Sequence, residues 1–279
     1  MATKEPLFDI AELKVLLVVT LLLAFGFAYR FSGPATLSNW FGNFILMIIL
    51  VGISVLVHEI FHRKIAGKFV AKVRSKIWLS GVVIFLILLL LTNGSFIFAA
   101  IWAITITPLR LLRPGRLWPH LGPRERALIA ASGPLANLGL AIVAKILQPV
   151  LGLLSEQLII INIWLAVINL IPFFTLLPII AAQKGTLAAK PIETPYVEGE
   201  FLFFGNRPLW VLVFFFTLVA GIGLVFLGLF ASIILALVLA LAIFIAWHYF
   251  LEPESGIPAV KMGGPHGTTA KGPSFRKYK

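Results

Sequence analysis

Long apolar runs separated by short polar segments make up most of this chain. A helix needs about 20 apolar residues to cross a hydrocarbon core of about 30 Å. Six runs reach or approach that length, and each is predicted to be a transmembrane helix: residues 13–31, 41–62, 127–150, 158–182, 209–227 and 228–250. The pattern therefore predicts an all-α integral membrane protein, a polytopic helical bundle with six transmembrane helices.

One further apolar run, residues 77–108, is broken by Thr92-Asn93-Gly94-Ser95. It is predicted to be a hydrophobic hairpin, either two short crossings or a pair of re-entrant helices. Residues 252–279 are rich in glycine, proline and lysine, a composition typical of flexible segments. The chain is thus predicted to hold one membrane-embedded domain, residues 1–251, followed by a flexible basic tail.

The composition makes lipid the solvent for much of the surface. The chain is 60% hydrophobic and 12% charged, whereas soluble domains are about half apolar and about a quarter charged. A net charge of +12 could indicate nucleic-acid binding, but the basic residues cluster between apolar runs, at 63–76, 110–126 and beyond 260. Positive loops stay cytoplasmic. We therefore expect a multi-pass protein of the cell membrane with both termini in the cytoplasm and no nucleic-acid partner.

The second apolar run ends in the sequence His58-Glu59-Ile60-Phe61-His62. Residues four apart share a helix face, so both imidazoles can bind one zinc ion, while Glu59 can take a proton from a metal-bound water. The chain has no cysteine, which excludes thiolate ligands. Ionisable residues within a membrane span are costly and mark function by default. The alternative interpretation is that the three side chains merely end the helix at the membrane surface.

Two further segments accompany this signature. Residues 132–137 read Ser-Gly-Pro-Leu-Ala-Asn, and residues 169–172 read Asn-Leu-Ile-Pro. In this order, across residues 41–210, the three segments resemble the motifs of the site-2 protease family of intramembrane zinc metalloproteases. The resemblance implies helices around one zinc ion and cleavage of membrane-anchored proteins within or near their transmembrane segment. It also implies that His58 and His62 bind zinc, that Glu59 is the catalytic base, and that Asn169 helps to hold the reacting carbonyl.

The third zinc ligand departs from the family pattern. Counting from Asn169, the family's aspartate falls at Leu177, and the only aspartate of the chain is Asp9. Residues 198–210 look like the segment that follows the aspartate in archaeal-type relatives, so Glu198 is predicted to replace it. Other glutamates of the predicted loop 183–208 are weaker candidates, namely Glu200 and Glu193. Alternatively, all three are solvated and offset nearby basic residues.

Three functions are compatible with these features. The leading prediction is a zinc endopeptidase that hydrolyses membrane-anchored proteins inside the bilayer. The second is a catalytically inactive relative that binds membrane partners without cutting them, which the missing aspartate supports. The third is a metal transporter, which needs polar residues along several spans. The stretch 201–204 is also a candidate edge strand for an extended substrate.

Overall fold

The fold consists mainly of helices long enough to cross a membrane. The computed structural model describes residues 7–31, 37–109, 121–173 and 197–251. In these ranges, six helices are long and apolar enough to cross a membrane, which confirms the predicted all-α polytopic membrane protein. These helices are α1 (Ile10–Phe31), α2 (Leu37–Lys68), α4 (Pro123–Leu151), α5 (Leu153–Leu170), α8 (Arg207–Phe226) and α9 (Leu229–Phe250).

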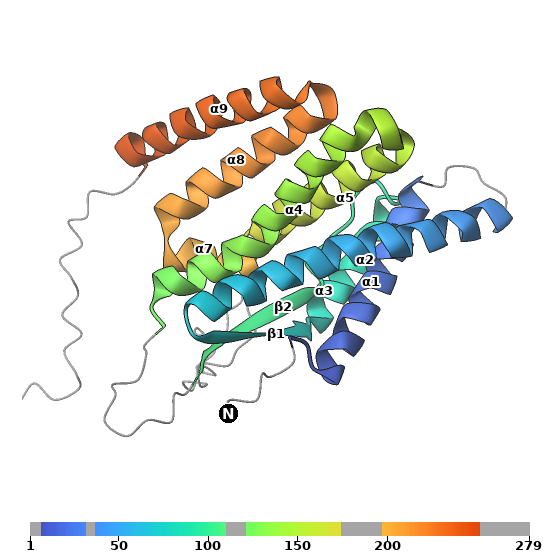
Figure 1. The fold of residues 1–279 in the computed structure, drawn as a ribbon, viewed down its shortest axis with the longest axis horizontal. Coiled ribbons are helices and arrows are strands. Elements are labelled where there is room, and N and C mark those ends of the chain that lie inside the picture. Colours follow the sequence, from blue (N-terminus) through green and yellow to red (C-terminus); the bar gives the residue numbers. More distant parts are fainter. Residues whose placement is uncertain (1–6, 32–36, 110–120, 174–196, 252–279) are drawn as a thin grey trace, which may run out of the picture.

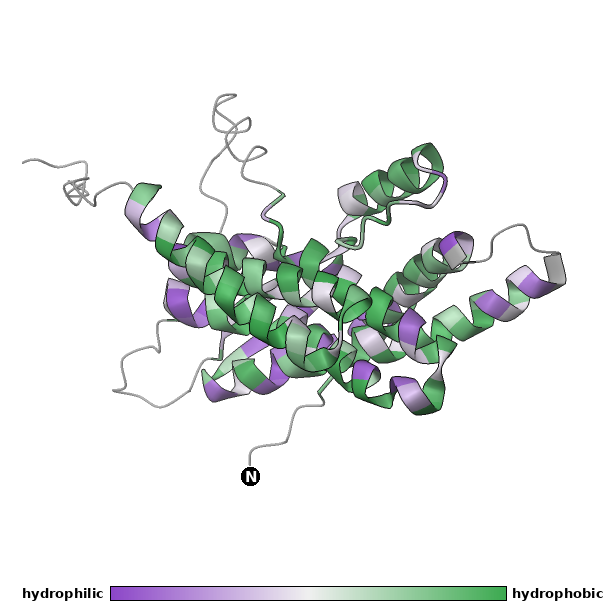
Figure 2. Ribbon diagram, turned by 90° about the horizontal axis from the view of Figure 1, so that it is seen from above, coloured by the Kyte–Doolittle hydropathy of each residue, from purple (hydrophilic) through white to green (hydrophobic). Residues whose placement is uncertain are grey.

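The helices stack in the order α1, α2, α4 with α5, α8 and α9 (Figure 1). Apolar residues predominate along these helices (Figure 2), and many of their large side chains are exposed. The outermost helix, α9, shows this best, because its large side chains at positions such as Phe230, Ile234 and Leu237 are exposed. Such a surface is stable in lipid rather than in water. The small residues Ser232, Ala236 and Ala240 form its buried face.

The predicted hairpin at 77–108 is wrong in its second half. Along the chain, a short apolar helix, α3 (Leu79–Leu91), follows strand β1 (Ala71–Ile77) and precedes strand β2 (Trp102–Pro108). The two strands pair with each other in antiparallel orientation. The strands pair from Ala71 opposite Pro108 to Ile77 opposite Trp102. An apolar run alone does not distinguish a buried strand from a helix. The predicted break is correct, since Asn93 and Gly94 have φ values of 48° and 76° in the turn after α3.

The structure also differs from the prediction after Leu170 and at residues 201–204. The helix expected at 158–182 ends at Leu170, because Ile171 is extended and precedes Pro172, which disfavours helical backbone before it. Residues 174–196 lie outside the described part of the chain. The candidate strand at 201–204, in the predicted loop, is wrong: these residues belong to a short helix, α7 (Glu198–Gly205). This helix packs on α4, α5 and α8.

Candidate metal centre

Two histidines of α2 and one glutamate of α7 meet inside the bundle. The Nε2 atoms of His58 and His62 are 3.0 Å apart. Glu198 Oε1 lies 2.7 Å from His58 Nε2 and 3.0 Å from His62 Nε2. All three side chains are buried. Among the described residues, they form the one cluster of at least three potential metal ligands, with donor atoms within 4.8 Å of one another.

This donor set fits zinc. Two imidazole nitrogens and one carboxylate oxygen are a set used by catalytic zinc sites, which keep a fourth position for water. Zinc binds such atoms at about 2.0–2.2 Å, so a tetrahedral ion separates its ligands by about 3.3–3.5 Å. Outward shifts of a few tenths of an ångström therefore suffice for His58, His62 and Glu198 to hold the ion.

The other ring nitrogens face polar groups of α4. His62 Nδ1 lies 2.8 Å from the carbonyl oxygen of Ile129. A carbonyl oxygen can only accept a hydrogen bond, so Nδ1 carries the proton and Nε2 offers its lone pair to a metal. The hydroxyl of Ser132 donates to the same carbonyl at 2.6 Å. The side-chain amide of Asn137 lies 3.0 Å from His58 Nδ1. The atom placed there is Nδ2, while Oδ1 has no hydrogen-bond partner among the described residues. Turning the amide over would let Oδ1 accept the Nδ1 proton that His58 carries when Nε2 binds metal.

Gly133 lets α4 approach the donor atoms closely. A Cβ built on this glycine would overlap Nε2 of both His58 and His62. Small residues let helices pack closely, and on α4 they also leave room next to the donor atoms. A side chain at this position would compete with the metal and its water for the same space.

Gly133→Ala should lower the affinity for zinc by at least about 10-fold, at the lower end of the losses seen when groups around a metal ligand are changed. The added methyl group would push the two imidazoles out of position. Zinc per chain, measured by atomic emission after dialysis against a chelating buffer, tests this. Gly139→Ala on the same helix is the control, because a Cβ there meets nothing within 4 Å. Equal zinc retention in both variants would contradict the prediction.

Glu198 is the first residue of α7, and its side chain lies next to the two histidines. The next residue, Gly199, lies against the end of α5, where a Cβ would overlap backbone atoms of Leu170 and Ile171. Burial by itself raises the pKa of Glu198, but the two imidazoles lower it to about 2. A lowered pKa favours the carboxylate, which is the form that binds metal.

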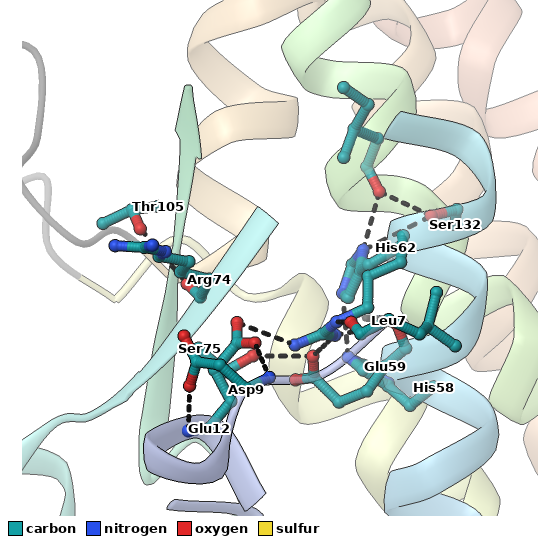
Figure 3. A network of polar contacts seen from close by, with 12 residues as sticks. Leu7, Asp9, Glu12, His58, Glu59, His62, Arg74, Ser75, Thr105 and Ser132 are labelled. Carbon is teal, nitrogen blue, oxygen red and sulfur yellow. Dashed lines mark hydrogen bonds and ion pairs between the residues drawn. The ribbon is translucent and has the colours of Figure 1, made fainter. Parts of the chain in front are cut away.

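Glu59 is held by donors from two elements (Figure 3). Its Oε2 accepts a hydrogen bond from the Ser75 hydroxyl of β1 at 2.6 Å and an ion-paired hydrogen bond from Arg63. The side chain is fully buried, and Oε1 has no hydrogen-bond partner in the described part of the chain. One oxygen is thus fixed, while the other can receive a proton.

The remaining sequence candidates divide into three cases. Asn169 is buried near the end of α5, and its Nδ2 has no partner in the ranges that the structure describes. Glu200 is buried on α7 but does not belong to the metal-ligand cluster. Glu193 lies outside the described residues.

The sequence did not indicate Trp102 as part of the site, and its buried ring lies 5.5 Å from that of His58. Only its position in an apolar run could have drawn attention to it.

A membrane bundle that buries a His-His-Glu group beside a glutamate fits a zinc metalloprotease. One curated protein supports that class: a protein of Methanocaldococcus jannaschii named "Putative zinc metalloprotease" is 28% identical over 178 residues. The similarity covers 60% of this chain and 81% of that protein. No family model matches the chain, and no solved structure matches it.

Proposed function

We propose that the protein is an intramembrane zinc metalloprotease of the site-2 protease type. Its substrates would be membrane-anchored proteins, hydrolysed within or near their transmembrane segment. The observation that carries the proposal is the His58–His62–Glu198 cluster on a membrane-crossing helix, with Glu59 next to it. This cluster supplies the third ligand that an inactive relative would lack.

The position of the cluster along α2 supports cleavage at membrane depth. Residues 41–57 are uncharged and precede the cluster directly. The next exposed cation after it, Lys64, lies six residues beyond His58, or about 9 Å at 1.5 Å per residue. We therefore expect the site to lie at the end of the apolar part of the helix. With the basic loops in the cytoplasm, it would open towards that side, and both termini would be cytoplasmic.

The chain's own residues can perform peptide hydrolysis. Bound zinc would supply Lewis-acid chemistry, acidifying a water and polarising the scissile carbonyl. Oε1 of Glu59 takes a proton as the water oxygen bonds to the carbonyl carbon. Glu59 then returns this proton to the nitrogen as the C–N bond breaks. The Nδ2 group of Asn169, which has no partner among the described residues, is proposed to donate to the carbonyl oxygen as it becomes negative.

His58→Ala should remove both zinc and hydrolysis, because it deletes one of three protein ligands from a buried site. The assay uses purified protein in liposomes with two probes, a single-span membrane reporter and the unfolded soluble protein β-casein. His248→Ala serves as the control, since His248 is exposed near the end of α9 and stacks on Phe244.

Cleavage of the reporter that His58→Ala abolishes supports the proposal. Cleavage that persists in His58→Ala would contradict it. Zinc binding without cleavage of either probe would favour the alternative, an inactive relative that binds membrane partners. Cleavage of β-casein alone would retain the metalloprotease and reject the membrane-anchored substrate.

A further inference from the structure

A buried polar network connects Glu59 to the residues that precede and begin the first membrane helix, α1. We propose that an N-terminal clamp, defined as Leu7, Phe8 and Glu12, acts through Arg63 to position the Glu59 carboxylate. Ser75 of β1 fixes the same carboxylate from another side. The proposal rests on the proposed protease function and assigns positioning residues to it. None of these residues belongs to the metal-ligand cluster.

The clamp surrounds the Arg63 guanidinium on several sides. Arg63 Nε donates to the carbonyl oxygen of Leu7 at 3.0 Å. Its NH2 group donates to Glu12 Oε1 at 3.2 Å. The guanidinium carbon lies 4.1 Å from the centre of the Phe8 ring, which is within the range of a cation–π contact. These contacts fix the plane of a long side chain that would otherwise have many rotamers.

Local helix chemistry aims Glu12 at Arg63. Asp9 and Glu12 form a capping box at the start of α1: the Glu12 N–H donates to Asp9 Oδ1 at 2.8 Å, and the Asp9 N–H donates to Glu12 Oε2 at 3.0 Å. One Glu12 oxygen is therefore engaged by the cap, and the other accepts a hydrogen bond from Arg63. The first turn of α1 is thereby coupled to the helix that carries the histidines.

Arg63 passes this restraint to Glu59. The two residues are four apart on α2, so they share a helix face. Arg63 NH1 also donates to the Glu59 main-chain carbonyl oxygen at 2.9 Å. The same group contacts Glu59 Oε2, which also accepts the Ser75 hydroxyl. Two donors from different directions on one oxygen hold the carboxylate in a single rotamer and leave Oε1 available for proton transfer.

Charge balance explains why the clamp is coupled to the base. Arg63, Glu12 and Glu59 are all buried, so one cation lies between two anions in an apolar surrounding. When one of two anions that flank a buried cation is neutralised, Coulomb attraction draws the cation towards the other. If Glu12 lost its charge, Arg63 would therefore be drawn further onto Glu59 and displace the carboxylate. A displacement of about 1 Å at a reacting group can cost about 10²-fold in rate.

The test compares matched variants of the full-length protein in the liposome assay. Glu12→Gln removes the charge that faces Arg63, whereas Asp9→Asn removes a charge from the same turn and keeps the cap. Ser75→Ala removes the hydroxyl that binds Glu59, whereas Thr105→Val removes a hydroxyl that binds a main-chain carbonyl in the same sheet. Each variant is measured for kcat, KM and zinc per chain.

We expect Glu12→Gln and Ser75→Ala to lower kcat by about 10- to 100-fold, the range found for groups that orient a ligand or catalytic residue. KM and zinc content should remain those of the wild type, and both control variants should retain the wild-type kcat. Arg63→Lys should keep more activity than Arg63→Gln, because it retains a cation next to Glu59. It should still be less active than the wild type, because lysine lacks the planar fork that contacts Leu7, Glu12 and Glu59.

Three results would overturn the inference. Wild-type kcat in both Glu12→Gln and Ser75→Ala would show that neither residue positions the base. Loss of zinc together with loss of activity would indicate a structural role instead. Equal losses in the Asp9→Asn and Thr105→Val controls would show that the effect is not specific. If the wild type itself hydrolyses neither probe, the proposed function fails first, and the inference falls with it.

Discussion

Glu59→Gln should reduce peptide hydrolysis by about 10²- to 10⁴-fold, the range that a positioned general base contributes. Glutamine has nearly the same shape as glutamate, but its amide cannot take a proton from water at neutral pH. Glu59 is not one of the three clustered donor residues, so zinc per chain should stay that of the wild type. The measurement is kcat for the single-span reporter, together with the metal content of the same preparation.

The matched control is Glu156→Gln, which makes the same change at an exposed position of α5 and should leave both quantities unchanged. Zinc retained without activity would separate chemistry from metal binding. Substantial hydrolysis by Glu59→Gln would reject Glu59 as the base, even if the metal site itself proved correct. The pair of measurements thus tests the catalytic step rather than the fold.

The membrane helices could be predicted from sequence because their signal is local. Each needs only a run of apolar residues, and the histidine pair needs only a spacing of four on one helix. The same locality explains the error at residues 77–108. That segment is apolar throughout, and its division into α3 and two strands depends on what it packs against. That Phe85 of α3 and Ile104 of β2 are buried can be seen only in the three-dimensional structure.

The rest of the site depends on contacts between segments far apart in the chain. Ser75 and Glu59 are 16 residues apart, and Glu198 and His58 are 140 apart. No periodicity links such pairs. Glu198 could be proposed only because a resemblance in the residues after it suggested a displaced ligand. Arg63 was visible as one of many basic residues near a helix end, and nothing in the sequence indicated that it faces Glu12.

Glu198→Ala should lose zinc and hydrolysis together, because a site with only two histidine ligands binds zinc weakly. The structure places Glu198 Oε1 within 3.0 Å of both imidazole Nε2 atoms, so no described side chain is better placed to complete the set. Glu198→Asp should retain part of the zinc, since the carboxylate remains but is shorter by one methylene. Zinc per chain and the zinc-dependent rise in melting temperature both report on this.

The control is Glu200→Gln, a change at a second buried glutamate of α7 that lies outside the ligand cluster. Zinc that binds only the folded protein stabilises it by about 4 kcal/mol when its concentration is about 1,000 times Kd. The zinc-dependent rise in melting temperature should be present in the wild type and in Glu200→Gln, and absent in Glu198→Ala. A fully occupied, thermally stabilised site in Glu198→Ala would reject Glu198 as the third ligand. Loss of zinc binding in Glu200→Gln alone would assign the role of third ligand to Glu200.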